Sequence, residues 1–237
     1  MVIKVTGDTH GEKERIKEYK ELYDSNPCFD VLLICGDFGY IFRDNKKERK
    51  FLDIIENQCP FEIWFVDGNH ENFDSIYKYP IENWNGGKIH RIKKNIIHLI
   101  RGEVYKINNK KLFVFGGGYS IDKQSRQKYE MKNNRKVWWE QEFPTQEEID
   151  NAYTNLGKNN WNVDYVFTHS APTNVLPLVQ EFFISDAKWE VDIVNKTLED
   201  IRQKLNFKHW YFGHYHGEKN IDEDFTVLYL TSRTIEI

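Results

Sequence analysis

The sequence of 237 residues has few cysteines and no long apolar segment. Its three cysteines, Cys28, Cys35 and Cys59, do not form a CxxC arrangement, which excludes a disulfide framework and a thiolate zinc site and favours a reducing compartment. No segment approaches the roughly 20 apolar residues of a transmembrane helix. A strand-like run begins at residue 2, so we expect no signal peptide, no membrane association and a cytoplasmic location.

The chain also lacks a strong charge of either sign. Its net charge of −4 gives no overall field that would attract a long polyanion, so we expect no long nucleic-acid tract as a partner. Repeats and low-complexity segments are absent as well. The hydrophobic content of 40% is that of a globular protein, and we predict a single domain over residues 1–237. The oligomeric state and the substrate stay open.

Short apolar runs recur along the chain, and most end at a glycine or a turn, which predicts buried strands. We place strands at 2–5, 31–34, 62–66, 96–100, 103–107, 111–115, 165–167, 210–212, 227–230 and 234–237. Apolar residues at three- and four-residue spacing predict helices at 12–24, 45–58 and 189–205, and a capping box of Thr145 and Glu148 starts another. This early alternation of strands and helices predicts a partly parallel sheet covered on both faces.

Polar residues that can bind a metal or carry a proton follow five of these strands. They are Asp8, His10, Asp37, Asn69, His70, His169, His214 and His216. Ligands gather beyond the carboxyl ends of strands in such sheets. All these donors are oxygen or imidazole nitrogen, which suits Mn²⁺, Fe, Zn²⁺ or Ni²⁺. Without His70, which we assign to proton transfer below, seven candidate ligands remain, and these are too many for one tetrahedral ion. Asp37 is the natural bridge between two ions because a carboxylate has two oxygens.

The spacing within these motifs predicts which side chains point together. Asp8 and His10, like His214 and His216, are two residues apart, so in extended backbone both members of a pair face one spot. Asn69 and His70 are adjacent and point in opposite directions in an extended chain. We therefore assign the Asn69 amide oxygen to a metal and leave His70 for proton transfer.

Taken in order, the blocks resemble the five signature motifs of the calcineurin-like metallophosphoesterases. The blocks are Asp8-Thr9-His10, Gly36-Asp37, Gly68-Asn69-His70-Glu71, His169 and Gly213-His214-Tyr215-His216. This resemblance implies an α/β fold, a four-layer αββα sandwich of mixed β-sheets, with a dinuclear metal centre. It implies one metal on Asp8, His10, Asp37 and His216, and a second on Asp37, Asn69, His169 and His214. Mn²⁺ is the first choice.

The implied reaction is hydrolysis of a phosphate ester. Two metals about 3.5–4 Å apart clamp a phosphate and lower the pKa of a bridging water, and the resulting hydroxide attacks phosphorus in line. We predict a metal-dependent phosphoesterase with His70 and Asp37 as catalytic residues, acting on a small phosphorylated molecule, a nucleotide or a phosphoprotein. The alternatives are a nuclease or cyclic-nucleotide phosphodiesterase with the same metals, and a non-catalytic scaffold that keeps the fold.

One block departs from the protein Ser/Thr phosphatases of this superfamily. Tyr40 and Ile41 stand where those enzymes carry an Asp that orients the catalytic histidine and an Arg that holds phosphate. Arg43 is therefore a candidate for substrate binding, and Asp44 or Glu71 for the missing carboxylate. The alternative for Arg43 and Asp44 is an exposed loop with no such role.

Residues 119–143 form a second unusual segment, in which basic and aromatic residues alternate without apolar periodicity. We predict a specificity loop or cap insertion, with Arg126 and Trp138 as candidates for binding substrate by charge and by stacking. The alternative is a solvated connection whose tryptophans fill the edge of the core.

Overall fold

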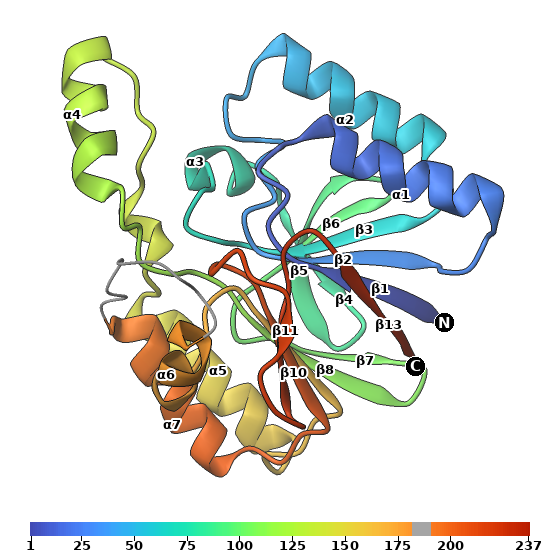
Figure 1. Cartoon of the computed structure of the whole chain (residues 1–237), viewed down its shortest axis with the longest axis vertical. Helices are drawn as coiled ribbons and strands as arrows, with labels where there is room; N and C mark the ends of the chain where they lie inside the picture. The colour runs from blue at the N-terminus through green and yellow to red at the C-terminus, as the bar shows by residue number, and fades with distance from the viewer. Residues whose placement is uncertain (182–190) are drawn as a thin grey trace.

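Two mixed β-sheets lie face to face, with helices on both outer faces (Figure 1). The computed structural model describes residues 1–181 and 191–237. The first sheet has the order β13-β1-β2-β3-β6-β5-β4, and the second has the order β11-β12-β10-β9-β8-β7. In the first sheet β1, β2, β3 and β6 are parallel neighbours, and in the second β8, β9, β10 and β12 are.

The element bounds are as follows. The first sheet contains β1 (Val2–Thr6), β2 (Val31–Cys35), β3 (Glu62–Val66), β4 (Ile81–Trp84), β5 (Gly87–Lys93), β6 (Ile96–Leu99) and β13 (Ser232–Glu236). The second contains β7 (Val104–Ile107), β8 (Lys110–Phe115), β9 (Tyr165–Thr168), β10 (His209–Phe212), β11 (Lys219–Asn220) and β12 (Phe225–Val227). The helices are α1 (Lys13–Ser25), α2 (Lys46–Gln58), α3 (Phe73–Ile76), α4 (Lys123–Asn133), α5 (Gln146–Lys158), α6 (Leu176–Gln180) and α7 (Ile193–Lys204).

Strand β2 shows how the sequence builds these layers. Alternate side chains of a strand point to opposite faces of its sheet. Leu32 and Ile34 join the apolar core beneath α1 and α2. Val31, Leu33 and Cys35 join the core between the two sheets. Strand β2 is apolar on both faces, and it is therefore covered by helices on one face and by the second sheet on the other.

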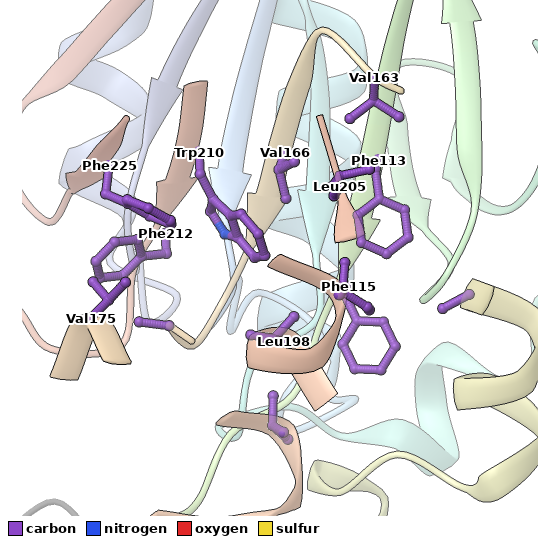
Figure 2. Packing of buried hydrophobic residues seen from close by; sticks show 14 of the residues in the cluster. Phe113, Phe115, Val163, Val166, Val175, Leu198, Leu205, Trp210, Phe212 and Phe225 are labelled. Carbon is purple, nitrogen blue, oxygen red and sulfur yellow. The ribbon is translucent and has the colours of Figure 1, made fainter. Parts of the chain in front are cut away.

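The second sheet repeats this arrangement on its outer face. Phe113 and Phe115 of β8 lie with Trp210 and Phe212 of β10 in a third core, against Leu198 of α7 (Figure 2). Three apolar cores thus separate four layers of secondary structure. The predicted α/β fold, a four-layer αββα sandwich of mixed sheets, is confirmed.

The hairpin formed by β4 and β5 was not predicted from the sequence. Asn85 and Gly86 at its turn have φ angles of 48° and 88°, which type I′ turns require and Asn-Gly supplies. β4 lies at the edge of the sheet, where its side chains are exposed or half-buried and leave no apolar run.

Three other predictions need correction. The strand predicted at 227–230 ends at Val227, because the chain then turns and the Tyr229 carbonyl accepts hydrogen bonds from Thr6 and Arg15. The helix predicted at 189–205 spans residues 193–204, and residues 189 and 190 lie outside the described part. The loop predicted at 119–143 contains α4, whose one buried residue is the polar Arg126, so no apolar period marks it.

None of the described helices is both long enough and apolar enough to span a membrane. The cytoplasmic location stays a prediction.

Candidate metal centre

The eight predicted site residues come together where strands of both sheets end. Asp8 and His10 follow β1, Asp37 follows β2, and Asn69 and His70 follow β3. His169 follows β9 of the second sheet, and His214 and His216 follow β10. The site therefore lies across the two sheets, and side chains from both form it.

One group of side chains contains His10, His216 and Asp8. The Nε2 atoms of His10 and His216 lie 3.0 Å apart. The Asp8 Oδ2 atom lies 3.8 Å from Nε2 of His216. Asp8 is fully buried, and its carboxylate also accepts the His214 backbone N–H at 3.0 Å, which holds it in place.

A second group contains His169, Asn69 and His214. The His169 Nε2 atom lies 2.8 Å from Oδ1 of Asn69 and 3.1 Å from Nδ1 of His214. The other nitrogen of His169, Nδ1, lies 3.0 Å from the carbonyl oxygen of Cys35. Because a carbonyl oxygen only accepts, Nδ1 carries a proton and Nε2 is the atom that faces the group.

Asp37 lies between the two groups and is 2% exposed. Its Oδ1 lies 3.5 Å from Nε2 of His169, and its Oδ2 lies 3.8 Å from Nε2 of His10. The backbone N–H of His70 donates to Oδ1 at 2.7 Å and fixes the carboxylate. The two oxygens of one carboxylate thus face different donors. The two groups adjoin, since Oδ1 of Asp8 lies 3.3 Å from Nδ1 of His169, and Asp8, Asp37 and His169 form one buried group that could hold a metal ion.

The expectation of extended backbone at the paired motifs is wrong. His10, His214 and His216 have φ angles of 47°, 68° and 49°, in the left-handed region that is uncommon for residues other than glycine. As a result His214 and His216 do not face one spot: His214 contacts the second group and His216 the first. Left-handed turns rotate neighbouring side chains in a way that residue spacing alone does not predict.

Two glycines make the approach of these loops possible. A Cβ atom at Gly36 would lie 2.0 Å from Nδ1 of His169, and one at Gly68 would lie 2.0 Å from Oδ1 of Asp37. Any side chain at either position would displace a site residue. Both glycines are therefore required by the site, and the buried nitrogen and oxygen donors around them fit a divalent metal.

The Asp37 and Asp8 carboxylates control the charge of the His169 imidazole. Burial alone would lower the pKa of His169, but the Asp37 and Asp8 carboxylates raise it to about 9. Burial lowers the pKa of His214 well below its ordinary value, and neighbouring His169 lowers it further. Burial also lowers the pKa of His216. In the metal-free protein at neutral pH, one imidazolium therefore lies between two carboxylates.

We expect divalent metal binding to release a proton from His169. Below a pKa of about 9 both ring nitrogens carry a proton, and a metal must displace the one on Nε2. Affinity should therefore rise with pH towards 9, by about tenfold per unit for one proton. Calorimetric titration with Mn²⁺ at pH 7, in two buffers of different ionisation enthalpy, measures the release. Equal enthalpies in both buffers would contradict it.

His70 lies at the edge of the centre, beside a carboxylate that sequence reasoning missed. Its Nε2 lies 3.9 Å from Oδ1 of Asp122, at the start of α4. That Oδ1 is buried and accepts no hydrogen bond within the described chain. Burial lowers the pKa of His70, whereas the Asp37 and Asp122 charges raise it. No sequence motif links Asp122 to His70, because the two side chains come close only when the chain folds.

Asp44 and Glu71, the carboxylates predicted to replace the missing Asp beside His70, both have other partners. Asp44 accepts from Lys78 at 3.0 Å, and buried Glu71 accepts the Phe38 backbone N–H at 2.6 Å. Tyr40 is 2% exposed and belongs to the core beneath α1 and α2, together with Ile41. At the two positions where the Ser/Thr phosphatases carry an Asp and an Arg, this chain therefore has side chains that pack into the core.

A buried network from residues 119–143 supports Asn69. The Asn69 amide donates to Ser120 at 3.0 Å, and Ser120 donates to Glu142. The Arg126 guanidinium donates to Ser120 at 3.1 Å and to the carbonyl oxygens of Asn69 and Val137. With the amide nitrogen engaged by Ser120, the Asn69 oxygen faces His169.

Three residues were predicted to bind substrate: Arg126, Trp138 and Arg43. The donors of Arg126 are used inside the protein, so its substrate-binding role has no support in the structure. Trp138 lies half-buried beneath the Lys123 ammonium, 4.2 Å from the ring centroid. Arg43 is exposed and lines a cavity next to His10 and His70. From this segment α4 projects away from the two-sheet body (Figure 1).

The chain matches the model of a known family. The family described as Calcineurin-like phosphoesterase matches residues 1–218. The chain belongs to this family, whose members are metal-dependent phosphoesterases. Curated protein sequences return no match. One solved structure aligns over 96% of this chain and 89% of its own, with 11% identity and a TM-score of 0.49.

Proposed function

We propose that the protein hydrolyses phosphate esters with two divalent ions, of which Mn²⁺ is the first choice and Fe, Zn²⁺ and Ni²⁺ are alternatives. The observation that carries this proposal is the position of Asp37, whose two oxygens face different donor groups. One ion would be held by Asp8, His10, His216 and Asp37, and the other by Asn69, His169, His214 and Asp37. Once bound, the ions supply positive charge to the transition state and activate water as nucleophile.

His70 is the proton donor in this proposal. It follows Asn69 directly, is about one-third exposed, and lines the cavity next to His10. From there it can protonate the leaving oxygen of a substrate that occupies the cavity. Asp122 stabilises the protonated imidazole by charge. Every predicted metal ligand is present, which argues against the non-catalytic scaffold.

The cavity also bears on the substrate. Its volume is about 370 Å³, within the range of sites for small molecules. We therefore favour a small phosphorylated molecule or a nucleotide over a phosphoprotein.

The proposal is tested by activity after removal and replacement of metal. The chain is stripped with a chelator, reloaded with Mn²⁺, Fe²⁺, Zn²⁺ or Ni²⁺, and assayed on p-nitrophenyl phosphate, bis-p-nitrophenyl phosphate, nucleotides, a phosphopeptide and DNA. We expect hydrolysis of monoesters that is lost on stripping and restored by metal. Faster hydrolysis of the diester or of DNA would favour the phosphodiesterase or nuclease alternative, and no hydrolysis with any metal would favour the scaffold.

A further inference from the structure

A cavity opens directly beside the candidate metal centre. His10 and His70 line it together with the start of α1, the first two turns of α2 and the segment 39–43 between β2 and α2. Because His70 is the proposed donor to the leaving oxygen, a cavity that His70 lines receives the leaving group. What lines it therefore bears on which leaving group the enzyme accepts.

The cavity is positively charged, although the whole chain has a net charge of −4. Lys13, Arg43 and Lys47 line it, and its one carboxylate is Glu48. Three positive charges and one negative charge leave a formal balance of +2. Both oxygens of Glu48 accept the Arg43 backbone N–H, at 2.9 and 2.7 Å, so this carboxylate is directed at the backbone.

The three cations are not neutralised in pairs. Elsewhere on the surface, Lys17 pairs with Glu14 at 3.0 Å and Lys78 pairs with Asp44 at 3.0 Å. Within residues 1–181 and 191–237, Lys13, Arg43 and Lys47 form no salt bridge through their side chains. Their charge is therefore available to an anion in the cavity.

The rest of the cavity suits the carbon part of a small molecule. Tyr40 and Phe51 are 2% and 5% exposed and form part of its wall, along with Phe42. The Lys13 ammonium lies 4.9 Å from the centroid of the Phe51 ring, which holds the cation over the aromatic wall.

We propose that this cavity binds a second phosphate group of the substrate, carried on the leaving-group side of the scissile phosphate. A phosphate dianion matches the balance of +2, whereas a neutral alcohol or a single carboxylate leaves charge unmatched. The preferred substrate is therefore a small organic bisphosphate. This inference rests on the proposed phosphoesterase function.

The test compares substrates that differ only in the second phosphate. The Mn²⁺-loaded protein is assayed on alkanediol bisphosphates of two to six carbons and on the alkyl monophosphates of the same lengths. We expect kcat/KM to favour the bisphosphate by at least about 30-fold at the best length, well beyond the factor of two that its two ester groups provide. Raising the salt concentration should reduce this preference, because exposed charges are screened.

Two variants of equal charge locate the effect. Lys13→Gln/Arg43→Gln/Lys47→Gln should reduce the bisphosphate preference at least about tenfold, mainly through KM. Lys17→Gln/Lys46→Gln/Lys50→Gln removes the same charge from positions of α1 and α2 outside this cavity and should keep the preference.

The outcomes separate the inference from the function on which it rests. Equal kcat/KM for bisphosphates and monophosphates in the wild type, or an equal loss of preference in both variants, would overturn the second-phosphate site while the phosphoesterase function stands. Absence of hydrolysis of every substrate with every metal would overturn both.

Discussion

Asp37→Asn is expected to abolish the binding of both divalent ions and to lower kcat/KM by at least about 10³-fold. Its two carboxylate oxygens face different donor groups, so one substitution changes the ligand field of both. The amide supplies one oxygen and no charge, and its nitrogen cannot ligate. Since bound metals supply several kcal/mol to the transition state, their loss corresponds to a change of this size.

Metal content distinguishes this bridging role from that of an ordinary ligand. Mass spectrometric metal analysis should find two ions per wild-type chain and almost none in Asp37→Asn. His10→Ala, which removes a donor from one group alone, should retain about one ion. Asp44→Asn is the matched control, because Asp44 pairs with Lys78 away from the centre. Two ions per chain in Asp37→Asn would rule out the bridge.

The second large effect is expected for His70→Gln, and its size should depend on the leaving group. Alkyl phosphates need a proton donor, so their kcat should fall by roughly 10²–10⁴-fold. p-Nitrophenolate leaves almost without help, so p-nitrophenyl phosphate should lose less than about tenfold. Both ions should stay bound. An equal fall on both substrates with metals retained would mean that His70 binds phosphate and that another group is the acid.

The pH dependence of the wild type checks the same role. The acid is active only when protonated, and burial lowers the pKa of His70 below its ordinary value of 6.5. Activity on alkyl phosphates should therefore be high below this lowered pKa and fall as pH rises through it. Bound metal cations lower the pKa further.

Asp122 provides the control for that pH profile. Asp122→Asn removes a charge that raises the pKa of His70, so the fall in activity should move to lower pH. The metal content should stay at the wild-type value. A profile that does not move would mean that the 3.9 Å contact has no effect on His70.

The family, the fold class and the residues that meet at the centre were predictable from the sequence. Parallel strands bring their carboxyl ends to one edge, so polar residues after β1, β2 and β3 had to lie near one another. The strands are short and apolar on both faces, which only a sheet covered on both sides accommodates. Both inferences need only the apolar runs along the sequence and the polar residues that follow them.

The resemblance implied the two groups of candidate ligands, but residue spacing placed His214 and His216 at one spot, and only the tertiary structure shows that they separate. His214 and His216 separate because left-handed turns rotate their side chains, and these turns lie against loops distant in sequence. Asp122 reaches His70, and Ser120 reaches Asn69, across more than fifty residues of chain. Helix α4 was hidden because its buried contact is made by a charged arginine, whose donors satisfy backbone carbonyls. Contacts of this kind are formed by packing, and sequence periodicity reports only which face of an element is apolar.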